Sequence, residues 1–215
     1  MVLGVDFDNT IVDYGSLMHA IASEQGLIGR DHPKTKGAIR DSIRRLPEGE
    51  LRWRRVQAVA YGARMQDAQL VPGVEGLFLK CRRHEIPVYI VSHKTEYSNL
   101  GESDVNLRTA ALAWLVSHGF FDACGIALEP DHVFFHDTRD EKIERIKTLR
   151  ITHFIDDLEE LFREPEFPAG IVRILFAPLC RSSRRDGIHA FASWDEITRY
   201  MFGCMAAFKA VANHG

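Results

Sequence analysis

The 215-residue chain is 46% hydrophobic and 27% charged, with a net charge of −3, which is ordinary for a globular protein of one domain, or one domain with a sizeable insert. The charge balance excludes the basic footprint of a nucleic-acid-binding protein, and no apolar run approaches the roughly 18 residues of a membrane span. The four cysteines are far apart and no leader pattern begins the chain, so we expect a reduced, cytoplasmic protein.

The first predicted strand, Val2–Phe7, is apolar until it ends in acidic residues. Asp6 and Asp8 stand at this end, and Asn9 and Thr10 follow directly. Continuous apolar runs are typical of parallel strands, because both of their faces are covered. Since ligands bind at the carboxyl ends of the strands in open α/β sheets, the two carboxylates lie where a binding site is expected.

A helical segment interrupts the chain after this strand. Its three apolar stripes at helical spacing are Leu17, Met18, Ile21 and Ile28, then Ile39, Ile43 and Leu46, and then Val56, Val59, Ala60 and Ala63. The turn residues Val71-Pro72-Gly73 mark its end. We therefore predict a small helical domain, residues 14–69, inserted into a core domain formed by residues 1–13 and 70–215.

After the insert, apolar runs alternate with helical patterns. The runs predict four more strands, Pro87–Ser92, His132–His136, His153–Asp156 and Ile171–Phe176. Possible capping boxes, Thr138 with Glu141 and Ser193 with Glu196, indicate where two helices begin. The last helix is predicted from the stripe Ile197, Tyr200, Met201, Cys204, Phe208 and Val211. This alternation predicts an α/β fold with a doubly wound, parallel, five-stranded Rossmann-like sheet.

Polar residues end three of the five predicted strands. Asp6 ends the first strand, Ser92 the second, and Asp156 with Asp157 the fourth. Asp6 and Asp156 could hold Mg²⁺, which takes one or two carboxylates and completes its shell with water and phosphate oxygens. Two plainer interpretations stay open: Ser92 could simply end a strand, and Asp157 with Glu160 has the pattern of a helix cap.

The phase of one predicted helix singles out a lysine. At about 100° per residue, its apolar direction is defined by Ile143, Ile146 and Leu149. Lys142 falls roughly 40° from this direction and Lys147 roughly 100° away. We therefore predict that Lys142 points toward the sheet, where its ammonium could meet a phosphate or carboxylates. Arg139 lies near the same face, in the first turn.

Other polar and aromatic residues are weaker candidates for contact with a substrate. Lys94 is a secondary candidate for substrate contact. Trp53, Arg54 and Tyr61, in the insert, could face a substrate, but we expect them to pack. The basic segment 181–185 is expected to be a solvated loop.

The order of these residues resembles that of the haloacid dehalogenase superfamily, most of whose members are phosphatases. The D-x-D-x-T motif of that family matches the stretch from Asp6 to Thr10, and its strand-ending Ser or Thr matches Ser92. Its lysine at the start of a helix matches Lys142, and its acidic pair matches Asp156-Asp157. The insert lies where the superfamily places its first type of cap.

The resemblance implies a role for each matched residue. Asp6 would attack phosphorus and form an aspartyl-phosphate, and Asp8 would act as general acid and then general base. Mg²⁺ would be held by Asp6, the backbone carbonyl of Asp8 and Asp156, with Asp157 in support. The residues that would bind the phosphate are Asn9, Thr10, Ser92, His93 and Lys142.

We therefore predict a capped, magnesium-dependent phosphomonoesterase. Its substrate would be a small soluble phosphate ester, such as a sugar phosphate, a nucleotide or a biosynthetic intermediate, with no nucleic-acid or membrane partner. The oligomeric state stays open.

Several alternatives are weighed against this function. A dehalogenase of the same fold lacks the second Asp of D-x-D, so Asp8 argues against it. A signalling receiver carries its acidic pair first in the chain and has no cap. A non-enzymatic phosphate-binding or regulatory protein on the same scaffold usually loses one of the carboxylates, and all are present here.

Overall fold

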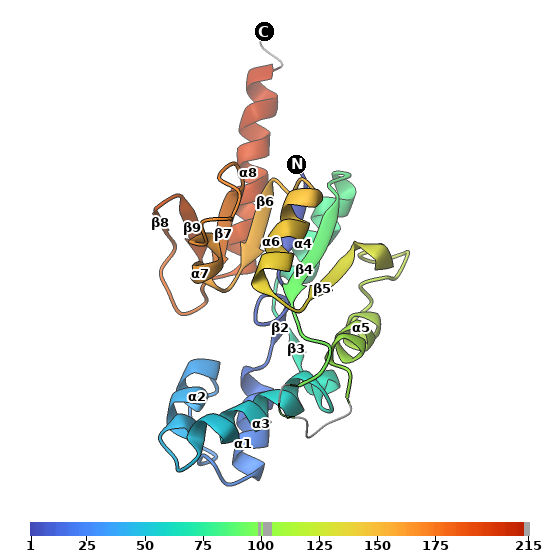
Figure 1. Cartoon of the computed structure of the whole chain (residues 1–215). Helices are drawn as coiled ribbons and strands as arrows, with labels where there is room; N and C mark the ends of the chain where they lie inside the picture. The colour runs from blue at the N-terminus through green and yellow to red at the C-terminus, as the bar shows by residue number, and fades with distance from the viewer. Residues whose placement is uncertain (99, 101–104, 213–215) are drawn as a thin grey trace.

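The computed structural model describes residues 1–98, 100 and 105–212, with side chains up to residue 203. Within these residues a seven-stranded sheet forms the centre of the molecule (Figure 1). In spatial order its strands are β5 (Val133–His136), β4 (Val88–His93), β1 (Leu3–Val5), β6 (His153–Asp156), β7 (Val172–Phe176), β9 (Ile188–Phe191) and β8 (Ser183–Arg185). Neighbouring strands are parallel, except that β8 runs antiparallel to β9.

The strand order confirms the doubly wound fold. The sheet grows outward from β1 in both directions, to β4 and β5 on one side and to β6 and β7 on the other. These are the five predicted strands. As a consequence of this order, the carboxyl ends of β4, β1 and β6 lie next to one another.

The sheet is larger than the five strands predicted from the sequence, because β9 and β8 extend it beyond β7. A two-residue hairpin turn at Asp186 and Gly187 joins them, with φ angles of 51° and 76°. Asp-Gly is a strong hairpin signal, so this turn was readable in the sequence. The segment 181–185 is exposed as expected, but Ser183–Arg185 within it is a strand rather than a loop.

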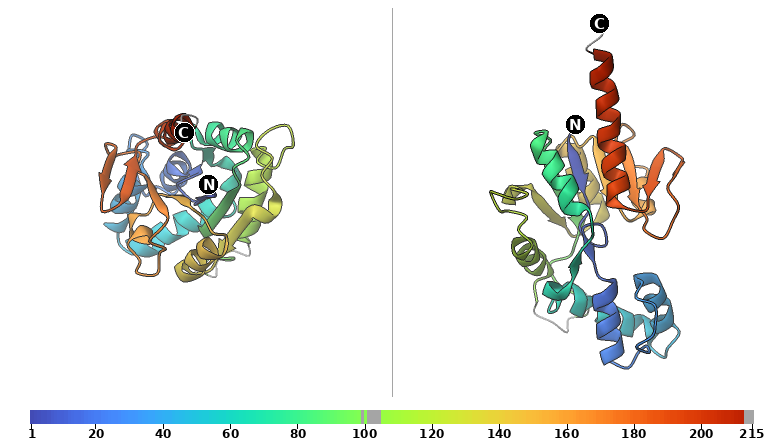
Figure 2. Two further views of the ribbon diagram at one scale, coloured as in Figure 1. Left: turned by 90° about the horizontal axis from the view of Figure 1, so that it is seen from above. Right: turned by 180° about the vertical axis from the view of Figure 1, so that it is seen from behind.

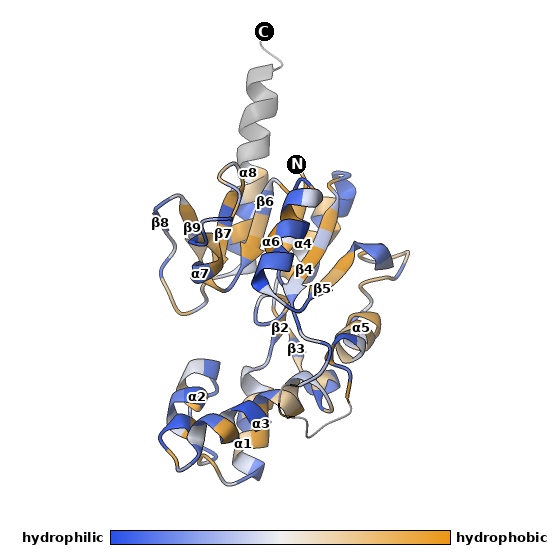
Figure 3. Cartoon of the chain, in the orientation of Figure 1, coloured by the Kyte–Doolittle hydropathy of each residue, from blue (hydrophilic) through white to orange (hydrophobic). Residues whose placement is uncertain are grey.

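Helices cover both faces of the sheet (Figure 2). They are α4 (Val74–Arg83), α6 (Arg139–Thr148), α7 (Glu159–Phe162) and α8 (Trp194–Ala212), whereas α5 (Leu107–Ser117) lies nearer the helical insert, and the 3₁₀ turn η2 (Pro130–His132) leads into β5. Successive strand residues enter opposite layers: Ile90 and Ile155 pack with α4 and α8, and Val91 and Phe154 with α6. This two-sided burial explains the hydrophobic strands at the centre of Figure 3.

Both predicted capping boxes form. The Thr138 hydroxyl accepts a hydrogen bond from the Glu141 amide (3.2 Å), and the Ser193 hydroxyl from the Glu196 amide (3.3 Å). Each glutamate in turn accepts from the amide that precedes the capping residue (3.0 Å in both). These bonds fix where α6 and α8 begin. Within the stripe predicted for α8, the side chains outside the described residues are those of Cys204, Phe208 and Val211.

The predicted helical insert follows β1. It contains α1 (Gly15–Glu24), α2 (Lys36–Arg44), α3 (Gly49–Tyr61) and the 3₁₀ turn η1 (Met65–Asp67). The chain enters and leaves it through a ribbon of two antiparallel strands, β2 (Val12–Asp13) and β3 (Gln69–Leu70). Figure 1 shows α1–α3 beyond the carboxyl end of β1, at the opposite end of the molecule from the last turns of α8.

The three insert helices pack against one another and bury most of the predicted apolar stripes, but Ile28, Leu46 and Ala63 lie beyond the helix ends, and Ala63 is exposed. The Thr35 side chain caps the start of α2, which buries Ile39 and Ile43. Trp53 of α3 is also buried, as expected, whereas Arg54 is exposed. Gly15 allows α1 to start close to the loop before α2, because a Cβ at this position would stand 2.4 Å from the Lys34 carbonyl oxygen. The buried residues of the insert belong to the same continuous hydrophobic cluster as those of β1 and α4.

Candidate active site

Asp6 lies at the focus of the three adjacent strand ends. It follows β1 directly, and its amide donates to the Ile155 carbonyl of β6 (2.9 Å). Its Oδ1 accepts hydrogen bonds from the Ser92 hydroxyl of β4 (2.9 Å) and from the Lys142 ammonium of α6 (2.6 Å). Its Oδ2 has a longer contact with the Thr10 hydroxyl (3.3 Å). Four predicted site residues thus meet at one buried carboxylate.

Lys142 points toward the sheet, as its helical phase predicts. Its side chain is buried, and its Nζ donates to both Asp6 Oδ1 and Asp156 Oδ2 at 2.6 Å. Burial alone would lower the pKa of Lys142, but the two carboxylates outweigh burial and raise it above its ordinary value. Lys147 instead lies near the surface and pairs with Glu144 (3.3 Å). Arg139 pairs with Glu164, so only Lys142 enters this cluster from its helix face.

A cluster of three carboxylates lies beside this lysine. Oxygens of Asp6, Asp156 and Asp157 are all within 4.8 Å of one another. Burial, together with the charge of Asp6, raises the pKa of Asp156 to about 6 although Lys142 opposes the shift. Burial and the two neighbouring carboxylates also raise the pKa of Asp157 well above its ordinary value. Lys142 and, at Asp157, Lys36 oppose these shifts without reversing them, and the hard oxygen donors of the three carboxylates fit a divalent cation such as Mg²⁺.

The second carboxylate of the D-x-D motif has a separate set of partners. Both oxygens of Asp8 accept from the Lys94 ammonium at 2.9 Å, and Oδ1 also accepts from the Tyr14 hydroxyl (2.6 Å). Lys94 is buried, between the rings of Phe7 and Tyr61. Burial, followed by the charge of Asp8, raises the pKa of Tyr14. Each carboxylate of the motif thus has its own lysine.

Sequence reasoning ranked Lys94 too low. Side chains alternate between the faces of a strand, so Lys94 is expected on the same side as Ser92, two residues earlier, and His93 on the other. The structure agrees with this alternation. The His93 side chain is exposed and its Nε2 lies 2.9 Å from the Asp137 carbonyl oxygen, away from the cluster. The His93 side chain therefore does not reach the cluster in this structure, and phosphate binding by His93 stays a prediction.

The loop between β1 and β2 shapes the remaining wall of the cluster. Asn9 has a φ of 62°, a left-handed conformation that Asn tolerates better than most residues. Thr10 is buried, and its hydroxyl also contacts Asp157 Oδ1 (3.5 Å). The Trp194 indole N–H, at the start of α8, donates to the Thr10 carbonyl (3.1 Å). The loop is therefore held on one side by the cluster of three carboxylates and on the other by α8.

The insert contributes three residues to this region. Tyr14 and Tyr61 pack edge to face, with ring centroids 4.7 Å apart, and Tyr61 thereby reaches Lys94. Lys36, in the first turn of α2, faces the same region: burial would lower its pKa, but Tyr61 and then Asp157 raise it. Of the insert residues that sequence reasoning considered, Tyr61 reaches the site while Trp53 does not.

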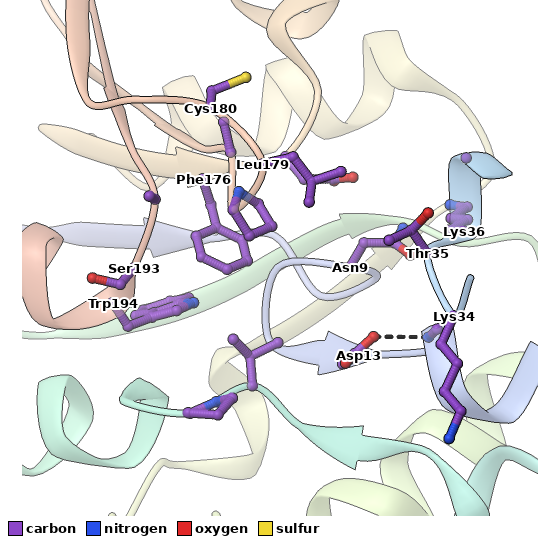
Figure 4. Close-up of a pocket in the computed structure, with 18 residues that line it drawn as sticks. Asn9, Asp13, Lys34, Thr35, Lys36, Phe176, Leu179, Cys180, Ser193 and Trp194 are labelled. Carbon is purple, nitrogen blue, oxygen red and sulfur yellow. Dashed lines mark hydrogen bonds between the residues drawn. The ribbon is translucent and has the colours of Figure 1, made fainter.

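A cavity of about 650 Å³ opens beside the carboxylates, between the start of α2 and the core (Figure 4). Asn9 and Asp157 stand where it meets the cluster. Thr35 and Lys36 belong to its insert side, and Phe176 and Leu179, from the end of β7 and the segment after it, belong to its core side. A pocket of this size accommodates a small organic molecule.

Solved structures similar to this chain share its fold. A haloacid dehalogenase-family hydrolase from Deinococcus radiodurans R1, with bound phosphate and sodium, matches at a TM-score of 0.55 and 13% identity over 93% of this chain and 94% of that one. A hydrolase of the same superfamily from Geobacter sulfurreducens matches at 0.55 and 12%, over 91% and 93%. An L-2-haloacid dehalogenase matches at 0.51 and 12%, over 93% and 97%.

No protein-family model and no curated protein matches the chain. The structural matches therefore establish its fold, which confirms the resemblance predicted from the four motifs at that level. They include hydrolases and dehalogenases alike, so the chemistry has to be argued from the residues of the site. In the described part of the chain, the helices are all too short or too polar to traverse a lipid bilayer.

Proposed function

We propose, from the haloacid dehalogenase fold of this chain and the charges around Asp6, that it is a magnesium-dependent phosphomonoesterase. It would hydrolyse a small soluble phosphate ester through an aspartyl-phosphate. One observation carries this proposal: the Asp6 carboxylate is oriented by Ser92 and Lys142 next to a cluster of acidic oxygens. Hydrolysis of a phosphate ester needs a nucleophile, positive charge and a cation site in one place, and this arrangement offers residues for each.

In the first step, Asp6 would attack phosphorus. Its Oδ1 is engaged by Ser92 and Lys142, whereas Oδ2 has only the 3.3 Å contact with Thr10 and is the freer oxygen. A bond forms between a carboxylate oxygen and phosphorus, and the ester oxygen leaves with its electron pair. The Lys142 ammonium and the Ser92 hydroxyl would neutralise and orient the phosphoryl oxygens. Asn9 and Thr10 would contribute from the loop.

Asp8 would handle the protons of both steps. It gives a proton to the leaving alcohol and later takes one from the water that attacks the aspartyl-phosphate, which frees the Asp6 carboxylate and phosphate. Lys94 and Tyr14 hold both oxygens of Asp8 in place. As a pair of donors, they suit the second step, in which Asp8 must be a carboxylate that accepts a proton.

Asp6 and Asp156 would hold Mg²⁺ through carboxylate oxygens, and Asp8 through its backbone carbonyl, with Asp157 beside them. The surroundings of Asp156 and Asp157 support this assignment, because burial first, and then the charge of the neighbouring carboxylates, raises their pKa values, and a bound cation would offset both effects. A bound Mg²⁺ supplies the positive charge that polarises the phosphoryl group. Asp156 also accepts from the Leu158 amide (2.8 Å), which fixes one of its oxygens.

The insert, residues 14–69, would serve as a cap domain on a core of residues 1–13 and 70–215. Its contacts with the site through Tyr14, Tyr61 and Lys36 support this role, since a cap excludes water and selects substrates. We also keep the proposal of a cytoplasmic enzyme, because Cys81, Cys124 and Cys180 are free thiols, as is usual in a reducing compartment.

Phosphate release tests the proposed function directly. Purified protein should release phosphate from a generic aryl phosphate and from members of a panel of phosphorylated metabolites when Mg²⁺ is present, and EDTA should abolish the release. Asp6→Asn should also abolish it while the variant still folds. Activity that survives both EDTA and Asp6→Asn would contradict the aspartyl-phosphate mechanism.

The dehalogenase alternative is favoured only by the structural neighbours that carry this name. It predicts chloride release from 2-chloro acids without added metal. That reaction needs neither a cation site nor a proton donor for the leaving chloride. The acidic cluster and Asp8, which Lys94 and Tyr14 hold in place, therefore favour the phosphatase. If neither phosphate nor chloride is released, the non-enzymatic binding protein becomes the better explanation.

A further inference from the structure

The cavity beside the carboxylates has two unlike ends. At the inner end, Asn9 and Asp157 border the acidic cluster, and Lys36 approaches it from the insert. Away from this end the core wall is apolar, with Phe176 and Leu179 among its members (Figure 4). A phosphate group at Asp6 would therefore extend its alcohol part along an apolar surface.

We infer that this cavity binds the leaving alcohol and that the alcohol is an apolar, ring-bearing group rather than a sugar. The inference rests on the proposed phosphatase function and narrows its substrate class. The lining is mainly apolar, and the volume of about 650 Å³ has room for a ring system. The polar lining residues lie mostly on the insert side and at the inner end, so sugar hydroxyls placed against the core wall would lose water and gain few hydrogen-bond partners there, which costs binding free energy.

Leu179 is the most informative residue of this wall. Its side chain is 82% exposed, so it contributes little to the folded core and is free to cover a ligand. Soluble proteins expose single apolar side chains routinely, but this one lies at the rim of a cavity that leads to the carboxylates. Contact with an apolar alcohol would remove its surface from water.

Esters of primary alcohols separate ring binding from leaving-group chemistry. We would compare 2-naphthylmethyl phosphate, methyl phosphate and glucose 6-phosphate, whose ester oxygens are all attached to a CH₂ or CH₃ carbon. The naphthylmethyl ester should have the highest kcat/KM, by roughly tenfold or more over the other two, as expected for a buried apolar group. Preference for glucose 6-phosphate would overturn the inference while leaving the phosphatase function intact.

A matched pair of variants locates the effect. Leu179→Asp should lower the ratio of kcat/KM for the naphthylmethyl ester to that for methyl phosphate by about tenfold. Val116→Asp is the control, because Val116 is 63% exposed on α5 and does not line the cavity. Equal effects of the two substitutions on this ratio would contradict the inference.

Thiol protection tests binding without any turnover. Cys180 is exposed and lines the cavity, whereas Cys124 is exposed elsewhere. The non-hydrolysable 2-naphthylmethylphosphonate, with Mg²⁺ present, should slow alkylation of Cys180 by iodoacetamide and leave Cys124 unaffected, as measured by peptide mass spectrometry. Protection of neither thiol would overturn the inference. Protection of Cys180 in a protein that releases no phosphate would support the site and contradict the proposed function instead.

Discussion

Replacement of Lys142 by Met should destabilise the metal-free protein strongly. Met keeps the length of the side chain but removes the ammonium that donates to Asp6 and Asp156 at 2.6 Å. Removal of one partner from a buried ion pair costs roughly 3–5 kcal/mol, because the other charge is left buried and unpaired. For a chain of this length that corresponds to a fall in melting temperature of roughly 6–20 °C. Turnover should also be lost, because no ammonium would face the phosphoryl group.

The free energy of unfolding in urea, measured with and without Mg²⁺, checks this reasoning. Without metal the variant should show the full loss near pH 7.5 and a smaller loss near pH 5, where Asp156, whose pKa is raised by burial, can take up a proton. Mg²⁺ should stabilise the variant more than the wild type, since the cation replaces the missing charge. Lys147→Met is the matched control and should be nearly silent. A Lys142→Met protein as stable and active as the wild type would refute the argument, as would an equal loss in the control.

Three further predictions concern proton transfer and pH. Asp8→Asn should lower turnover by about 10²–10⁴-fold, most severely for substrates with poor leaving groups, and rapid-quench experiments should trap labelled aspartyl-phosphate. Equal losses on all substrates, with no trapped intermediate, would mean that Asp8 mainly positions the metal. Lys94→Met should reproduce the leaving-group dependence of Asp8→Asn, and the double variant should be no worse than either single one; additive losses would show that Lys94 acts separately. Without metal, the contribution of Asp156 to the free energy of unfolding should fall as the pH rises from about 4 to about 6, because its pKa is higher in the folded state than in the unfolded state. This trend should disappear when Mg²⁺ is bound. A metal-free stability that rises over this pH range by a similar amount would contradict the raised pKa of Asp156.

The parts of the site that depend on local geometry were predictable from the sequence. Strand ends in a doubly wound sheet meet at one edge, so the positions of Asp6, Ser92 and Asp156 along the chain are enough to place them together. The phase of a single helix was enough to distinguish Lys142 from Lys147. Both rules need only the regular geometry of a strand or a helix.

The parts that depend on packing between distant segments were not predictable. Tyr14, Tyr61 and Lys36 reach the site only because the insert docks in one particular orientation, which no local pattern specifies. Lys94 and His93 differ, because strand alternation already assigns them to opposite sides of β4. The strand predicted from the sequence ends at Ser92, and so the alternation of side chains was not applied to His93 and Lys94, although β4 continues to His93.

The ribbon of β2 and β3 ties the insert to the loop that carries Asp8. Asp8 forms a β-bridge with Val12, the first residue of β2, and the carboxylate of Asp13 accepts from the Gly15 amide (2.7 Å) at the start of α1. The backbone that shapes the D-x-D loop is thus continuous with the ribbon of β2 and β3, and so a rotation of the insert displaces this loop. An exchange of inserts between chains of this fold would therefore have to carry residues 12–70 as a unit. A graft cut at 14 and 69 would separate the helices from the strand pairing that sets the position of Asp8.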